Sequence, residues 1–165
     1  MATKPTPADQ LANMVALNVF RFRVNVASES LSGGTPSVAA EMRFQECTGL
    51  EATVEPKAIK EGGRNYGAPQ RAGAVSFATV VLKRGVSSDR RMWQIFNAFT
   101  TGQYALRLQV TITLLWPLDG VTTDIMTWQL QHAMPVKFKF ADFNGKAAEV
   151  GIEELHLVHE GLHAV

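Results

Sequence analysis

The sequence is poor in the features that mark secreted, membrane-bound or disulfide-stabilised proteins. Its 165 residues include one cysteine, Cys47, so an intramolecular disulfide is ruled out. No apolar run approaches the roughly 18 residues of a membrane span, and the first 24 residues lack the apolar core and small-residue cleavage site of a secretory signal. We therefore expect no signal peptide and no membrane span, in a chain whose length fits one domain.

The chain also lacks an excess of charge of either sign. Lys and Arg number 16 and Asp and Glu number 15, which leaves a formal net charge of +1. Binding to nucleic-acid phosphates needs a basic surface, and neither that excess nor an aromatic-basic motif is present. Charged residues make up only 19% of the chain, which indicates that partner molecules cover part of its surface.

Motifs for catalysis or cofactor binding are missing as well. The glycines of the segment EGGRNYG, residues 61–67, lie between two expected strands and are followed by no Gly-Lys-Ser/Thr, whereas a phosphate loop needs a strand before it and a helix after it. No Gly-x-Ser-x-Gly elbow occurs. Cys47 lies in an apolar strand context, which is typical of a buried inert thiol. We expect no catalytic residue and no cofactor.

Three histidines near the end of the chain leave one chemical alternative open. His156, His159 and His163 are spaced three and four residues apart, which on a helix would place them on one face, where they could bind a metal. The segment also alternates in polarity as a strand does, and Gly161 interrupts it. We favour structural or surface histidines on a strand and expect no metal site.

Alternation of apolar and polar residues predicts a chain made mainly of strands. Pro56 argues that its strand lies at a sheet edge, and Asn144-Gly145 is a hairpin signal. Both faces of the strand 74–83 are apolar, so we expect both to be covered. Residues 60–73 have loop composition, and a short helical turn is expected over 10–17. The expected strands are 20–26, 38–47, 50–59, 74–83, 104–114, 123–132, 135–141 and 147–158.

One helix is predicted over 88–100. Ser87 or Ser88 is the expected cap, Asp89 the acidic residue of the first turn, and Gly102 the stop. An apolar stripe at helical spacing, which we expect to pack on a sheet, consists of Met92, Trp93, Ile95, Phe96 and Phe99. The fold class is therefore mainly β: an antiparallel barrel or two packed sheets with one flanking helix. Residues 1–17 would form an N-terminal arm and 18–165 a single domain.

Seven segments in order carry sequence motifs that belong together. They are FRFRVNV at 20–26, FQECTGL at 44–50, EGGRN at 61–65, LKRG at 82–85, LLWPLDG at 114–120, MPVKF at 134–138 and GIEELHLVHEGL at 151–162. These segments cover most of the chain from residue 20 to residue 162, and they resemble the gp19-like family of tail tube proteins from contractile phages and phage-derived extracellular particles.

The resemblance implies a structural protein with the tail-tube (Hcp-like) fold. Six copies would form a ring whose inner strands close into one barrel around a lumen, and rings would stack into a tube inside a contractile sheath. The implied partners are further copies of the chain, the sheath protein, the baseplate hub or tube-initiator proteins, and a possible lumen cargo. The implied location is a phage tail or tail-like particle assembled in the bacterial cytoplasm.

The resemblance also implies which residues make contacts between subunits or rings. They are Glu61, Gly62, Gly63, Arg64 and Asn65 in the loop before LKRG, Lys83, Arg84 and Gly85 in the turn into the helix, and Glu160 and Gly161 near the last strand. Glu61 and Arg64 would form charge-assisted bonds across the interface. The alternative for all ten is that they are turn residues that serve the fold of the single chain.

Three other functions remain open at this point. The same family includes tube-initiation proteins that begin the tube at the baseplate. A secreted ring protein of a type VI system shares the fold but usually lacks these motifs. From a different class, a β-rich metal-dependent enzyme would use His156, His159 and His163.

Overall fold

Strands make up most of the described chain. The computed structural model describes residues 21–29, 39–102, 104–118, 121–143, 146 and 150–165. These residues form ten strands and the helix α2 (Arg91–Thr100). The strands are β1 (Phe22–Glu29), β2 (Ala39–Met42), β3 (Glu46–Thr48), β4 (Ala52–Ala58), β5 (Gln70–Phe77), β6 (Val80–Gly85), β7 (Arg107–Leu118), β8 (Val121–Lys139), β9 (Ile152–Val158) and β10 (Gly161–Ala164).

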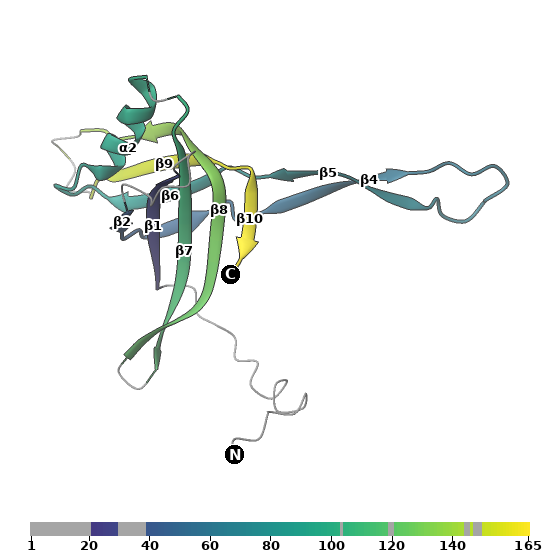
Figure 1. Cartoon of the computed structure of the whole chain (residues 1–165), viewed down its shortest axis with the longest axis horizontal. Helices are drawn as coiled ribbons and strands as arrows, with labels where there is room; N and C mark the ends of the chain where they lie inside the picture. The colour runs from purple at the N-terminus through teal and green to yellow at the C-terminus, as the bar shows by residue number, and fades with distance from the viewer. Residues whose placement is uncertain (1–20, 30–38, 103, 119–120, 144–145, 147–149) are drawn as a thin grey trace, which may run out of the picture.

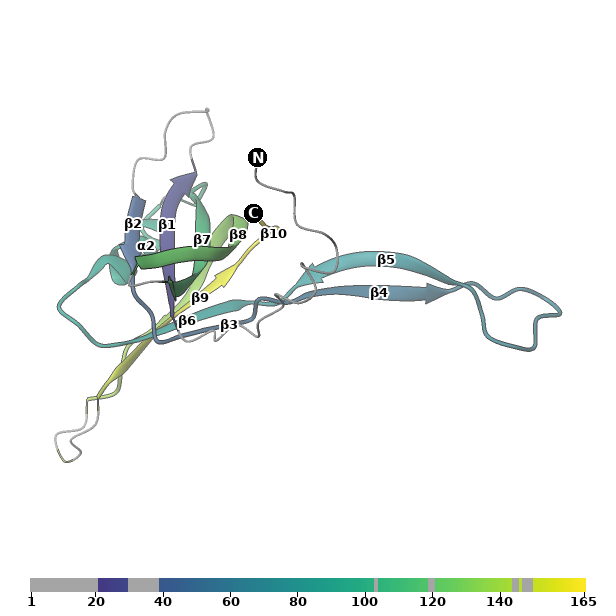
Figure 2. The same ribbon diagram turned by 90° about the horizontal axis from the view of Figure 1, so that it is seen from below.

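The strands divide into a body and a projecting hairpin. In the body, neighbouring strands pair antiparallel in the order β2-β1-β7-β8-β9-β6-β3, and β10 pairs with β8. Strands β4 and β5 form a separate two-stranded sheet. Figures 1 and 2 show this hairpin extending far from the body on one side. We call the segment from Ala52 to Phe77 the arm.

Strand β8 joins the two halves of the body. Its first part pairs with β7 and its last part with β9, and the register shifts in both pairings. His132 has a φ of 50°, which is uncommon for a residue other than glycine, and it lies where β8 passes from one partner to the other. The prediction of two strands over 123–132 and 135–141 was therefore wrong, because a bulge lets one strand of 19 residues serve both sheets.

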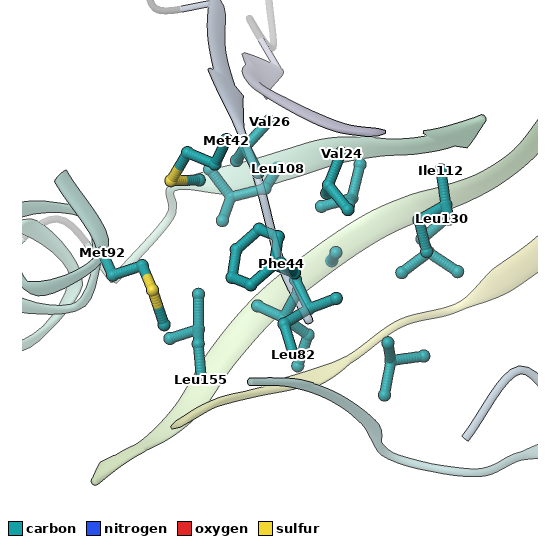
Figure 3. Close-up of a cluster of buried hydrophobic side chains, with 14 residues drawn as sticks. Val24, Val26, Met42, Phe44, Leu82, Met92, Leu108, Ile112, Leu130 and Leu155 are labelled. Atoms are coloured by element: carbon teal, nitrogen blue, oxygen red, sulfur yellow. The ribbon is translucent and has the colours of Figure 1, made fainter. Parts of the chain in front are cut away.

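The core lies inside the curved body. Figure 3 shows its side chains converging from the strands, with Met92 reaching in from α2 towards Leu155. On β6 and β9 every second residue is buried, as expected for strands with one face on the core. The core residues are Val24, Val26, Met42, Phe44, Val80, Leu82, Met92, Leu108, Val110, Ile112, Leu130, Ala133, Leu155 and Leu157.

Helix α2 packs on the body through one side, as the apolar stripe predicts. Met92 is fully buried, and the ring of Trp93 lies 5.5 Å from that of Phe138 on β8. The helix begins at Arg91 rather than at residue 88, and neither Ser87 nor Ser88 caps it. Asp89 lies just before the first turn, where its carboxylate accepts a hydrogen bond from the backbone N–H of Arg91 at 3.0 Å. Thr101 follows the last turn, and Gly102 has a φ of 123°.

The strand predicted over 74–83 is two strands. The strand conformation is interrupted between Phe77 and Val80, where the chain leaves the arm and enters the body. Gly49 packs so tightly against this break that an added Cβ would lie 2.1 Å from the carbonyl oxygen of Thr79. Most of β5 is exposed, so the described chain does not itself cover both faces of the arm part. The predicted loop 60–73 is also too long, since β5 begins at Gln70.

The fold class is otherwise confirmed: a mainly β, antiparallel protein with one described flanking helix. Pro56 lies in an edge strand, as expected, and the strand predicted over 38–47 divides into β2 and β3. The strand β10 was not anticipated. Three expectations lie outside the described residues: the N-terminal segment 1–17, the helical turn over 10–17 and the hairpin signal at Asn144-Gly145. No helix in the described part of the chain has the length and apolar character of a membrane span.

Candidate functional site

The arm is held together by its own backbone and by little else. Among the described strands, each strand of the arm pairs only with the other, and every residue of β4 is exposed. The register shifts between Val54 and Pro56, and Gly73 lies opposite this bulge, where an added Cβ would come within 2.3 Å of the carbonyl oxygen of Glu55. A two-stranded hairpin without a core is at best marginally stable in water, so the arm is suited to being covered by a partner.

Exposed apolar side chains run along the arm. Val54 and Val75 face each other across the two strands and are 47% and 55% exposed. Ile59 is about as exposed as Val54, and Tyr66 at the tip is 94% exposed. Exposed apolar side chains gathered on a protruding element indicate an interaction surface.

The tip of the arm contains the five residues predicted from EGGRN. Glu61 and Arg64 pair with each other at 3.2 Å, and the N–H of Arg64 donates to the carbonyl oxygen of Glu61. Gly62 and Gly63 have no atom within 4 Å of an added Cβ, and Gly63 has a φ of 85°. The charge pair expected across an interface therefore forms within the loop, while the glycines and Asn65 remain open to a partner.

Arg84 lies in the body rather than on its surface. It is 7% exposed on β6, and its guanidinium donates to the carboxylate of Glu153, which is 4% exposed, and to both the carboxylate and the carbonyl oxygen of Asp89. Hydrogen bonds from Arg91, and then from Arg84, hold the pKa of the Asp89 carboxyl far below its usual range. This network fastens the segment before α2 to β6 and β9.

Lys83 and Gly85 lie beside Arg84 on β6, and both are more exposed than Arg84. The ammonium of Lys83 lies 2.7 Å from the carboxylate of Glu46 on β3, and this hydrogen bond raises the pKa of Lys83. Gly85 ends β6 opposite Ile152. The LKRG segment is thus the end of a strand, and the turn into the helix comes after it.

Glu160 and Gly161 lie where the chain turns from β9 into β10. The N–H of Glu160 donates to the carbonyl oxygen of Gln131 at 3.0 Å, and Gly161 is buried beside the same residue. An added Cβ on Gly161 would lie 3.0 Å from His163 and 3.1 Å from Gln131. Glu160 itself is exposed. Glu160 and Gly161 thus form one turn of the body, which is separate from the arm tip.

The three histidines lie on and around strands, as favoured. His156 is 3.3 Å from Glu154 on β9, and His159 Nδ1 donates to the carbonyl oxygen of Gly161 at 3.0 Å. Burial lowers the pKa of His159, whose ring packs on Phe77. Among the described residues no three His, Cys, Asp or Glu side chains come together as metal ligands would.

Cys47 faces the inner side of the body. It packs against the core beside Phe22 and Leu50. Burial raises the pKa of its thiol to about 11, which leaves almost no reactive thiolate at neutral pH. Cys47 is therefore the inert thiol that its sequence context indicates.

Sequence reasoning missed two features. The first is the set of exposed apolar residues on the arm. The apolar character of both faces of 74–83 was the available signal, and it predicted coverage without saying what covers them. The second is the buried ion pair between Arg84 and Glu153, residues 69 positions apart. No local pattern reveals such a pair, because antiparallel pairing of β6 with β9 brings it together.

Comparison with protein families gives one match that spans nearly the whole chain. The sequence profile described as T4-like virus tail tube protein gp19 matches residues 18–163. No curated protein sequence matches the chain significantly.

Solved structures with a similar fold come from contractile particles. A chain in the six-fold symmetrised anti-feeding prophage baseplate is 26% identical, with a TM-score of 0.77 over 92% of this chain and 96% of that one. A chain of the extended sheath-tube complex of the extracellular contractile injection system PVC is 20% identical, with a TM-score of 0.73 over 98% and 99%. A chain of the anti-feeding prophage cap is 18% identical, with a TM-score of 0.74 over 96% and 97%.

Proposed function

This chain belongs to the family of the T4-like virus tail tube protein gp19, and from that premise we propose that it builds the inner tube of a contractile injection system or contractile phage tail. In this proposal six copies form a ring and rings stack into a hollow tube. Its work is mechanical, so it makes and breaks no covalent bond. The observation that carries the proposal is the match over residues 18–163, supported by a body with a projecting, uncovered arm.

The arm supports assembly for a physical reason. A hairpin with Val54 and Val75 about half exposed gains stability when another copy covers it, because burying apolar surface contributes roughly 25 cal/mol per Å². A surface that docks on a different surface of an identical copy produces rings or open stacks. We assign Glu61, Gly62, Gly63, Arg64 and Asn65 to this contact, with Lys83, Gly85 and Glu160 as further contacts and Arg84 and Gly161 as residues that shape them.

The proposed partners follow from the same premise. Besides further copies of the chain, they are a sheath protein around the tube and baseplate hub or tube-initiator proteins at its end. The related PVC chain comes from a sheath-tube complex, which supports the sheath as a partner. Assembly would take place in the bacterial cytoplasm, and the finished tube would enclose a lumen for cargo.

A second candidate is a tube initiator or another terminal ring. It is favoured by the baseplate chain, at 26% identity, and by similar folds in a cap and in a sheath/tube terminator. An initiator would stop at one ring or require its hub, whereas a tube protein polymerises with itself.

Negative-stain electron microscopy of the purified protein at several concentrations tests the two candidates. Hollow stacked rings or tubes are the expected result. Single rings that never stack would favour the initiator, and a stable monomer at every concentration would reject both roles for the chain on its own.

Replacing Gly62 and Gly63 together by valine tests the contact assignment. An added Cβ on either glycine would meet no atom within 4 Å, and the strain of a valine at the φ of 85° of Gly63 falls on the arm tip. Circular dichroism should therefore show a folded body, while the branched side chains should prevent stacking. Gln94→Val, an exposed change on α2, is the matched control and should leave tubes intact. Normal tubes from the double variant would reject the assignment.

A further inference from the structure

One histidine of the body packs on the root of the arm. Strand β10 lies on the side of the body from which the arm extends (Figures 1 and 2). In the turn between β9 and β10, the ring of His159 lies 5.0 Å from the ring of Phe77, the last residue of β5. Among the described contacts between rings, this is the one that joins the arm to the body. His159 is therefore placed to hold the arm in its direction.

The hydrogen bond of His159 defines which of its ring nitrogens carries the proton. Nδ1 lies 3.0 Å from the carbonyl oxygen of Gly161. Because a carbonyl oxygen only accepts, Nδ1 is the donor, and Nε2 of the neutral ring is an acceptor without a hydrogen. Nε2 is buried and has no hydrogen-bond partner among the described residues.

A second proton on this ring would be held at an unfavourable place. It would convert Nε2 into a charged N–H group, and a buried charged donor without an acceptor is costly. Burial accordingly lowers the pKa of His159 from its ordinary value of 6.5, against the opposing effect of the hydrogen bond to Gly161. The packed position of the ring thus favours the neutral form.

The charged groups around His159 do not compensate for that cost. None of them in the described chain accepts a hydrogen bond from Nε2. His132 pairs with Glu29 and His156 with Glu154, and no neighbouring charge contributes to the direction of the pKa shift of His159. The titratable groups on the adjoining elements are Glu51 before β4, His132 on β8, His156 on β9, Glu160 in the turn and His163 on β10.

We propose that His159 is a latch that holds the root of the arm on the body while its ring is neutral and releases it when the ring is charged. Between the lowered pKa of the closed latch and the ordinary value of 6.5, the open root binds more protons than the closed root, so acid favours opening. From pH 7.5 to pH 5.0 the open population can rise by at most about 30-fold. One consequence rests on the proposed function: a released arm would no longer be directed at the next copy.

Amide hydrogen exchange in the unassembled protein, isolated by gel filtration, tests the latch. The N–H of Ala78 donates to the carbonyl oxygen of Glu51 at 3.1 Å and closes the root of the arm. Its protection factor, measured by mass spectrometry and corrected for the intrinsic rate at each pH, should fall about 3- to 30-fold from pH 7.5 to pH 5.0. The amide of Leu155 in the core should change less than about two-fold. No fall at Ala78, or an equal fall at Leu155, would overturn the proposal.

Two matched variants separate His159 from the other histidines. His159→Phe keeps an aromatic ring beside Phe77 and takes up no proton, so its protection of the Ala78 amide should agree at the two pH values within about two-fold. His163→Phe changes an exposed histidine of β10 and should keep the acid response of the wild type. A response that survives in His159→Phe, or that disappears in His163→Phe, would overturn the assignment to His159.

The titration of His159 in the wild-type chain is a test that needs no variant. Deuterium exchange at the carbon between the two ring nitrogens follows the protonation of each histidine separately. The midpoint for His159 should lie below the ordinary value of 6.5, and a midpoint at or above that value would overturn the latch. All of these measurements use unassembled protein, so micrographs without rings or tubes would reject the proposed function while the latch is judged by exchange.

Discussion

The body and the arm are built from the same kind of antiparallel pairing and differ in what covers it. In the body, alternate residues of β6 and β9 are buried, whereas β4 is exposed along its whole length. Burial of apolar surface is the main favourable term in folding, so the body can stabilise itself. The arm has backbone hydrogen bonds, and the described residues give it no core. The difference separates a part that its own core stabilises from a part that, in the proposed tube, another copy would cover.

Charge pairs show the same contrast and yield the largest expected effect. Arg84→Met leaves the Glu153 carboxylate buried without its cation, which should lower the free energy of unfolding of the unassembled protein by about 3 to 5 kcal/mol. Arg64→Met at the arm tip breaks an ion pair whose side chains are both 52% exposed. This variant should change the free energy of unfolding by only about 0 to 1 kcal/mol. Urea denaturation measures both.

A second variant separates lost charge from lost shape at this site. The double variant Arg84→Met/Glu153→Leu removes both charges, so it should recover most of the stability that Arg84→Met alone loses. Equal destabilisation by Arg84→Met and Arg64→Met would contradict the contrast between body and arm.

Two valines five positions apart give a matched test of packing. Val80 on β6 is fully buried and Val75 on β5 is 55% exposed. Val80→Ala should destabilise the unassembled protein by about 2 to 3 kcal/mol, because two methyl groups leave a cavity, whereas Val75→Ala should stay within about 0.5 kcal/mol. The same two variants assayed for tube formation should reverse their order. If Val75→Ala assembles normally, the apolar side of the arm is not a contact.

A smaller effect is expected from Gly73, which probes the arm by itself. Gly73→Ala forces β4 and β5 apart at the bulge, and a strain of about 1.4 kcal/mol would open the hairpin about ten-fold more often. Limited proteolysis should then cleave faster after Lys57 and Arg71, while the urea midpoint of the body stays unchanged. Gly62→Ala has open space and should behave as wild type. A shifted midpoint for Gly73→Ala would mean that arm and body unfold together.

The smallest effect concerns Cys47. Because burial raises its pKa from 9.0 to about 11, the folded chain keeps a proton that the unfolded chain releases, so stability should fall as pH rises from about 9 towards 11. Cys47→Ser should remove this slope. At pH 8 the folded Cys47 thiol should react about 100-fold more slowly with a disulfide reagent than Val75→Cys in a Cys47→Ser background. Equal rates would show that the body opens as readily as the arm.

Much of the body was predictable because its residues carry a local signal. Alternation along residues 104–114 predicted β7, and the stripe of Met92 and Phe96 predicted α2. Element boundaries were less predictable. The continuous apolar pattern over 74–83 concealed the break before Val80, since a hydrophobic residue looks the same in the sequence whether its own core or another molecule covers it.

The candidate site was predictable only in part. The glycines of EGGRN indicated a loop, and that loop is the tip of the arm. Glu61 and Arg64, which pair at the tip, are only three residues apart, whereas the burial of Arg84 against Glu153 depends on a strand pairing that local sequence does not encode.

The sequence by itself determined that this chain is a mainly β protein with a helix, has a net charge close to zero and belongs to a tail tube family. Composition is a property of the sequence as a whole, and periodicity and motifs are properties of neighbouring residues. Only the tertiary structure decided which described strands share a core, which hairpin extends from it, and where distant charges meet. Those outcomes depend on contacts between residues far apart in the chain, and each is settled by the register of one strand against another.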